Sequence, residues 1–532
     1  MKTNVLYFGD NLEILRNREY FPDECVDLIY LDPPFNSKKD YNILFKENSG
    51  VQSEAQIKVF TDTWEWGPTA QNTYHDIVIN GPIKVGKLIG ALHDTIGHND
   101  VMAYLVMMTA RLIELHRVLK PTGSLYLHCD PTASHYLKLV LDQIFGPVNF
   151  RNEIVWKRGI AHSDSRRCGR IHEYLLFYSK TDNYVWNKEF MPYDPRYVET
   201  YYRYKDDDGH VFMSDNLVAP GGRGPRYEWK GIVRNWRVTR ENMKKLEKEG
   251  RIFYTKNGIP RLKRYLSDMP GMPLQSIWTD VLPIVSWSTE GLGYETQKPL
   301  ALLERIISAS SNEGDIVLDP FCGCGTAVVA AQKLKRRWIG IDITHLAINL
   351  MRSRLKDSFG IKAEVIGEPK DLSGAKALAH EDRYQFQYWA LGLIGARPIG
   401  EKKKGADKGI DGVIQFIDEA SGKPNRVVVQ VKSGHVGVNA VRELKAVAAN
   451  NAIGVFITLE PPTEPMKVES IDAGYYHSPI WNKDYPKIQI LTIEDLLHGK
   501  MVDMPPQTQT DVTFAKAQKI VQKEGEQLSM EQ

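Results

Sequence analysis

A carboxylate followed by two prolines is the first feature of the sequence that could carry chemistry. The apolar run at residues 26–31, VDLIYL, predicts a short buried strand. The strand leads directly into the motif DPPF, which is Asp32, Pro33, Pro34 and Phe35. A strand that ends in this way presents an acid at the edge of a sheet. The alternative interpretation is that Asp32 only caps the next element and that the prolines end the strand.

A glycine loop forms a second candidate site. In LDPFCGCGT, Gly323 and Gly325 lie between a predicted strand and a helix, where glycine lets a ligand approach the backbone closely. Asp342 ends the next strand, at about the spacing of an acid that binds a ribose. The third glycine of a dinucleotide motif is absent, since that position is Val328, and no P-loop lysine follows. S-adenosylmethionine, with a ribose and no pyrophosphate, suits the loop better. The alternative is a tight turn capped by Thr326.

A third candidate site lies in the stretch GADKGIDGVIQFIDEASGKPNRVVVQVKSG. Asp411 opens one predicted strand, while Gln430 and Lys432 alternate along the next and so share a face. Metal-dependent phosphodiester cleavage needs oxygen ligands for Mg²⁺ and a lysine near the attacking water, and these residue types match that need. The alternative is an exposed hairpin with a chance acid and lysine.

Length and composition indicate a multidomain globular protein. The 532 residues favour about three or four lobes. The net charge of +2 means that any nucleic-acid surface must arise from local charge patterning. No apolar run of about 20 residues could span a bilayer, and no signal peptide is evident, so we expect a cytoplasmic protein without membrane contact. The 5 cysteines lack repeated C-x-x-C spacing, which argues against disulfides and structural zinc.

The order of predicted elements changes along the chain. Strands and helices alternate from residue 1 to about residue 150, which predicts a parallel sheet, and the apolar pattern of residues 100–123 predicts a long helix closed by Pro121 and Gly123. The alternation stops at about 181–290 and then resumes through the glycine loop. The intervening segment interleaves arginines with aromatic residues: Arg223, Arg226, Arg234, Arg237, Arg240, Arg251, Arg261 and Arg264 with Tyr227, Trp229, Trp236, Tyr254 and Tyr265. That mixture suits phosphate neutralisation and base stacking, with an irregular solvated insertion as the alternative.

The first two sites together resemble a known family. LDPPF, followed far downstream by TQKP and LDPFCGCGT, is similar to the β class of amino-group DNA methyltransferases, in which the catalytic motif precedes the cofactor motif. GDNLEIL, HRVLKPTGSLYLHCD, NEIVWKR and HEYLLFYSK add to the resemblance, which covers about residues 1–360. It implies an α/β fold, a doubly wound Rossmann-like sheet that binds S-adenosylmethionine, with residues 181–290 as an inserted target-recognition region.

The resemblance also implies roles for single residues. The cofactor-binding residues would be Asp10, Thr296, Lys298, Asp319, Phe321, Gly323, Gly325, Thr326 and Asp342. Asp32 and the Pro33 carbonyl would accept the two protons of an exocyclic amine, Pro34 would help to hold that carbonyl rigid, and Phe35 would stack on a base flipped out of double-stranded DNA. The leading aspartate favours adenine N6, with cytosine N4 as the alternative and RNA as a further possible substrate.

The third site resembles the Mrr-like branch of the PD-(D/E)xK nuclease fold. The resemblance covers about residues 375–500 and implies Asp411 as an Mg²⁺ ligand, Asp407 as a second ligand, and Gln430 and Lys432 as catalytic residues. Gln430 departs from the commonest pattern, which has an acid there. The domain would then cleave DNA, or bind DNA without cutting it.

We therefore predict a restriction-modification methyltransferase with a fused endonuclease-like domain. The predicted domains are residues 1–365 for methyl transfer, 375–500 for the nuclease-like α/β domain and 503–532 for a flexible tail. Double-stranded DNA is the predicted partner. The oligomeric state stays open, with a homodimer as one alternative.

Overall fold

The computed structural model describes residues 1–34, 40–46, 52–61, 65–159, 166, 168–285, 288, 290–291, 296–399, 409–418, 424–449 and 453–506. The chain divides into two compact units. The smaller is Lys188–Gln275, and the larger comprises Met1–Asn187 and Ser276–Gln532. Phe35 and Asp407 lie outside the described residues.

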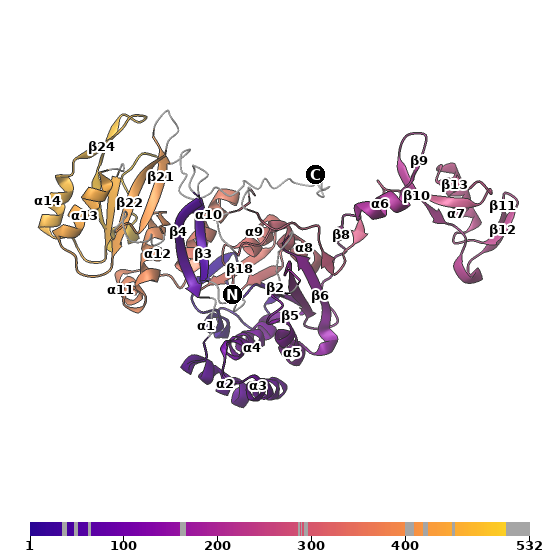
Figure 1. Ribbon diagram of the computed structural model, residues 1–532, viewed down its shortest axis with the longest axis horizontal. Helices are drawn as coiled ribbons and strands as arrows, with labels where there is room; N and C mark the ends of the chain where they lie inside the picture. The colour runs from indigo at the N-terminus through magenta and orange to yellow at the C-terminus, as the bar shows by residue number, and fades with distance from the viewer. Residues whose placement is uncertain are drawn as a thin grey trace. The chain divides into compact units, whose positions relative to one another are not determined.

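A nine-stranded sheet is formed by strands that lie between Val5 and Ile366 in the sequence (Figure 1). Its spatial order is β16 (Ile277–Trp278), β6 (Phe150–Lys157), β7 (His172–Ser179), β5 (Leu119–Cys129), β2 (Val26–Leu31), β17 (Ile316–Asp319), β18 (Arg337–Asp342), β1 (Val5–Phe8) and β19 (Glu364–Ile366). The strands from β5 to β19 pair in parallel, whereas β7 pairs antiparallel with both β5 and β6. The expected Rossmann-like α/β fold is therefore confirmed, with antiparallel strands added at one side.

Both faces of this sheet are buried. Ile29 and Leu318 belong to one apolar core, while Tyr30 and Val317, their neighbours along the strands, are buried outside that core. Because successive strand residues point to opposite faces, helices must cover both. The helices of this region are α1 (Asn11–Arg16), α2 (Pro68–Asn80), α3 (Ile83–Ile96), α4 (Asp100–Val118), α5 (Ser134–Phe145), η1 (Pro147–Asn149), α8 (Leu300–Ser310), α9 (Thr326–Lys333) and α10 (His345–Phe359). Strands β3 (Asp40–Lys46) and β4 (Gln52–Thr61) form an additional hairpin. Among the described residues, no helix has the length and apolar composition required to cross a membrane.

The long helix α4 ends earlier than the sequence predicts. It stops at Val118, and Pro121 and Gly123 lie within β5. A Cβ at Gly123 would lie 2.8 Å from the backbone oxygen of Asp27 in the neighbouring chain segment. Gly123 therefore permits a close approach of two strands, and it does not end the helix.

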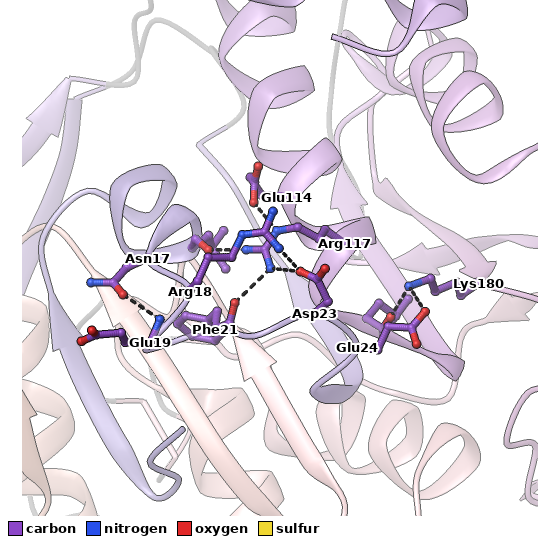
Figure 2. A network of polar contacts seen from close by, with 11 residues as sticks. Asn17, Arg18, Glu19, Phe21, Asp23, Glu24, Glu114, Arg117 and Lys180 are labelled. Carbon is purple, nitrogen blue, oxygen red and sulfur yellow. Dashed lines mark hydrogen bonds and ion pairs between the residues drawn. The ribbon is translucent and has the colours of Figure 1, made fainter. Parts of the chain in front are cut away.

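Arg117, near the end of α4, binds the segment that leads into β2 (Figure 2). Its guanidinium donates hydrogen bonds to the backbone oxygens of Leu15 and Phe21. It also forms ion pairs with Asp23 and Glu114. These contacts fix the start of β2, the strand that carries Asp32 at its end.

Replacing Arg117 with methionine should destabilise the larger unit. The two backbone oxygens would lose a charged donor, which costs about 2 kcal/mol and lowers the Tm of a unit of this size by about 2–4 °C. Differential scanning calorimetry would measure the shift. Arg18→Met is the matched control, because Arg18 binds the same Asp23 from an exposed position. An equal shift in both variants would contradict this role for Arg117.

The smaller unit is built from short strands around two buried tryptophans. Its elements are β8 (Phe190–Met191), α6 (Pro195–Tyr201), β9 (Tyr204–Lys205), β10 (Val211–Asn216), η2 (Pro220–Gly222), β11 (Arg226–Trp229), β12 (Ile232–Asn235), α7 (Arg240–Lys248), β13 (Ile252–Tyr254), β14 (Pro260–Tyr265) and β15 (Met272–Pro273). Trp229 and Trp236 pack with Met243 in its core. These two tryptophans hold the unit together and are not exposed for base stacking.

The C-terminal region forms a separate five-stranded sheet. Its elements are α11 (Leu372–Glu381), α12 (Arg383–Leu393), β20 (Arg397–Pro398), β21 (Gly412–Ile417), β22 (Pro424–Lys432), α13 (Val438–Ala448), β23 (Ile453–Thr458), α14 (Glu464–Ile471), β24 (Tyr475–Ser478), β25 (Lys483–Pro486), β26 (Ile488–Thr492) and α15 (Ile493–Leu497). The sheet order is β20-β21-β22-β23-β26, antiparallel up to β22 and parallel beyond it. A mixed sheet with helices α12 and α13 against β22 agrees with the predicted α/β domain.

Candidate active site

Four acids named from the sequence lie at one edge of the nine-stranded sheet. Asp319 and Asp342 are the last residues of β17 and β18, and Asp32 follows β2 directly. Asp10 lies two residues beyond β1. Since β2, β17, β18 and β1 are parallel neighbours, their carboxyl ends meet, and this is the edge where α/β sheets bind ligands.

Asp32 forms an ion pair with Lys298 of the TQKP motif. Lys298 Nζ donates to Asp32 Oδ2, and both side chains are largely buried. Burial alone would lower the pKa of Lys298, but the carboxylates of Asp32 and Glu173 outweigh burial and raise that pKa. Pro33 is buried beside them, and Pro34 is partly buried. The structure thus brings Lys298, expected near the cofactor, into direct contact with the predicted catalytic acid.

The glycine loop is shaped by backbone conformations that favour glycine. Gly323 and Gly325 have φ angles of 48° and 75°, and Gly325 is the N-cap of α9. The N–H of Gly323 donates to Asp342 Oδ2 over 2.9 Å, and the N–H of Phe321 donates to Asp319 Oδ1 over 3.1 Å. A Cβ at Gly325 would lie 2.6 Å from Met351 Cγ. The loop therefore packs against the acids on either side of it.

Asp319 is a buried carboxylate, and Asp342 is a partly buried one. Burial raises the pKa of Asp319 well above its usual value, and the charges of Asp32 and Asp342 raise it further. Burial also raises the pKa of Asp342, opposed by hydrogen bonds from Thr344 and the Gly323 N–H. A cation close to these acids would stabilise their ionised forms.

Asp10 is held by residues that the sequence interpretation missed. Arg111 on α4 donates to both carboxylate oxygens of Asp10, at 3.0 and 2.8 Å, and to Asn11 Oδ1 at 2.6 Å. Asn11 in turn donates to the Pro320 oxygen at the glycine loop over 2.7 Å. An arginine inside the apolar run MMTARLIEL was the only sequence signal for this connection.

Three further residues are predicted to bind the cofactor: Thr326, Thr296 and Phe321. The Thr326 hydroxyl accepts a hydrogen bond from Arg354 over 3.1 Å, and the N-cap position belongs to Gly325. Thr296 is partly buried two residues before Lys298. Phe321 is partly buried against the apolar core. A cofactor role for these three residues stays a prediction.

The C-terminal site residues also come together. Asp411 Oδ2 accepts the backbone N–H of Val431 over 2.7 Å, between Gln430 and Lys432 on the adjacent strand. Gln430 is buried, and its Oε1 has no hydrogen-bond partner among the described residues. Burial raises the pKa of Asp411, opposed by the Val431 N–H and by Lys432. Asp411 therefore lies beside the strand that carries Gln430 and Lys432, and the catalytic roles of the three residues stay predictions.

Comparison with known proteins identifies both regions. Residues 26–352 match the profile of the N6/N4 DNA methylase family, and residues 385–498 match one described as NACHT-associated inactive restriction endonuclease 1. The first match covers more than half of the 532 residues, so the chain belongs to the DNA methylase family. Its C-terminal region is a restriction-endonuclease-like domain.

Individual relatives agree with this assignment. Type II methyltransferase M.EcaI of Enterobacter cloacae is 32% identical over 288 residues, 52% of this chain and 64% of that protein. The type III StyLTI Mod subunit of Salmonella typhimurium is 28% identical over 350 residues, 62% of this chain and 50% of the subunit. DNA adenine methyltransferase YhdJ of Escherichia coli is 24% identical over 370 residues, 69% of this chain and 88% of YhdJ. The chain thus spans about half to two thirds of the first two relatives.

Proposed function

We propose that the protein transfers a methyl group from S-adenosylmethionine to the N6 amine of adenine in double-stranded DNA. One observation carries the proposal: Asp32 follows strand β2, the glycine loop follows strand β17, and these two strands are paired in parallel. In that pairing Leu318 lies opposite Ile29. An amine acceptor and a cofactor loop therefore share one edge of the sheet. Membership of the DNA methylase family supports methyl transfer to DNA, and the similarity to the DNA adenine methyltransferase YhdJ supports adenine as the target.

The donor set fits S-adenosylmethionine. Asp319 and Asp342 are carboxylates that burial makes costly to ionise, and a ligand with a sulfonium and an ammonium group would relieve that cost. Asp342 would bind the ribose, Asp319 and the backbone of Gly323 and Gly325 the methionine end, and Asp10 the adenine end. When bound, the cofactor supplies an activated methyl group.

Asp32 and the backbone of Pro33 would orient the target amine. The amine lone pair is delocalised into the base, so nitrogen must become more tetrahedral before it can attack. Two fixed acceptors for its two protons favour that geometry, and a proline-fixed carbonyl is preorganised for the transition state. The base must leave the duplex first, at a cost of a few kcal/mol. Phe35 follows in the chain and is proposed to stack on the base.

The smaller unit is proposed to recognise the target DNA. It lies inside the predicted insertion and carries exposed arginines, among them Arg223, Arg226 and Arg234. Tyr197 and Tyr201 on α6 are exposed large aromatics whose ring centroids lie 4.6 Å apart. Basic side chains beside exposed rings suit phosphate contacts and base stacking.

Mass spectrometry of nucleosides would test the proposed reaction. Purified protein is incubated with unmethylated double-stranded DNA and cofactor labelled on the methyl group. Labelled N6-methyladenine is expected. Labelled N4-methylcytosine would instead establish the cytosine alternative, and label confined to added RNA would establish RNA as the substrate.

For the C-terminal domain we propose DNA binding without cleavage. Two observations favour this over nuclease activity: Gln430 supplies a neutral ligand where an acid is usual, and the matching family is described as inactive. Asp411 would then be the only acid of the site among the described residues. One carboxylate and one amide hold Mg²⁺ weakly.

A nicking assay distinguishes DNA binding without cleavage from nuclease activity. The wild-type protein with Mg²⁺ should leave supercoiled plasmid intact, methylated or unmethylated, while Lys432→Ala weakens DNA binding about threefold or more through the lost phosphate contact. Lys467→Ala is the matched control, because Lys467 is an exposed lysine on α14. Mg²⁺-dependent nicking by the wild type that vanishes in Lys432→Ala would contradict the proposal and establish a nuclease.

A further inference from the structure

A chain of buried polar groups lies across the strands next to Asp32. Tyr30 OH and His128 Nδ1 are 2.9 Å apart, and His128 Nε2 and Glu173 Oε2 are 2.7 Å apart. The three residues come from β2, β5 and β7, which are neighbours in the sheet. His128 is 0% exposed and Glu173 is 2% exposed. Charged or titratable groups buried so completely are rare without a specific role.

Glu173 is held at both oxygens. His128 binds Oε2, and Arg158, which is more than half exposed, binds Oε1. Burial alone would raise the pKa of Glu173, but Lys298, His128 and Arg158 outweigh it and lower that pKa. Glu173 is therefore a carboxylate fixed by two hydrogen bonds, and its charge acts on the ammonium of Lys298.

Two carboxylates act on the charge of Lys298. It binds Oδ2 of Asp32 directly, while Glu173 acts on it from within the sheet. An ammonium paired with Asp32 alone would draw electron density from Asp32 and weaken it as a hydrogen-bond acceptor. A second carboxylate shares the charge of Lys298, so Asp32 keeps its acceptor strength for an amine that becomes positive as it is methylated.

We infer that Glu173 is a positioning residue for methyl transfer, which acts through Lys298 to keep Asp32 oriented and strongly accepting. This inference rests on the proposed function. His128 and Arg158 orient Glu173, and Tyr30 links His128 to the strand that ends at Asp32. Because these residues act through Lys298 and Asp32, their effect should appear in the rate of transfer.

A double-mutant cycle tests this role. Single-turnover methyl-transfer rates and cofactor dissociation constants are measured for the full-length wild type, E173Q, K298M and the double variant. E173Q should slow transfer about 10- to 100-fold and leave the cofactor dissociation constant within about twofold. The double variant should be no slower than K298M alone, because Glu173 acts through Lys298.

Asp142→Asn serves as the matched control. Asp142 is a mostly buried acid that binds Tyr178 on β7, the strand of Glu173, and its replacement should leave the rate unchanged. If E173Q does not fold, H128Q replaces it in the same cycle with the same expected non-additivity. Effects of E173Q and K298M that multiply would overturn the inference, as would an unchanged rate in E173Q. A wild type that transfers no methyl group would instead refute the proposed function.

Discussion

Replacing Asp32 with alanine should lower the methyl-transfer rate about 10³-fold while leaving the cofactor dissociation constant within about threefold. Asp32 lies at the end of β2, outside the glycine loop, so the cofactor loses no direct contact. The amine loses the charged acceptor that orients it. Radiolabelled transfer under single-turnover conditions and calorimetric titration with cofactor would give the two quantities.

Asp32→Asn provides the matched control. Asparagine keeps one acceptor oxygen and nearly the same volume but cannot pair its charge with Lys298. We expect a loss of about 10- to 100-fold, smaller than that of alanine. If cofactor affinity falls as far as the transfer rate in Asp32→Ala, Asp32 has a structural role. That result would support the alternative interpretation, in which Asp32 of DPPF only caps the next element.

Replacing Asp342 with alanine should weaken cofactor binding and leave most of the transfer rate at saturating cofactor. The cofactor should bind about 10- to 100-fold more weakly, because a charged hydrogen bond worth about 1.5–3 kcal/mol is lost. The Gly323 N–H and Thr344 also lose their acceptor, which loosens the loop. At saturating cofactor, most of the transfer rate should return. Calorimetry and a cofactor titration of the rate would measure both effects.

Glu313→Gln is the control for Asp342. Glu313 is an exposed acid near the start of β17 whose ion pair with Lys335 spans 3.9 Å. Its replacement should leave cofactor affinity unchanged. An Asp342 variant that binds cofactor as well as the Glu313 variant would exclude Asp342 from the cofactor site.

The sequence predicted those parts of the site that depend on short stretches of chain. The run before Asp32 and the glycines around Cys324 each specify a strand end or a turn within a few residues. Because parallel strands present their carboxyl ends at one edge, motifs far apart in sequence could be placed together. The α/β fold and the positions of the acids followed from these local patterns.

The long-range partners could not be predicted in this way. Lys298 and Asp32 are 266 positions apart, and His128 meets Glu173 only because β5 and β7 pair antiparallel. Strand order and register decide such contacts, and neither has a local signal in one sequence. The early end of α4 at Val118 has the same origin, since the close approach of Gly123 to a neighbouring segment outweighs the helical pattern.

Asp32 is proposed to direct the methylation of adenine in DNA. Long-read sequencing of DNA from cells that express the wild-type protein, compared with cells that express Asp32→Ala, tests it most directly. We predict N6-methyladenine in one defined sequence motif with the wild type and no modified base with the variant. An absence of any modified base with the wild type, or the same methylation with the variant, would contradict the claim.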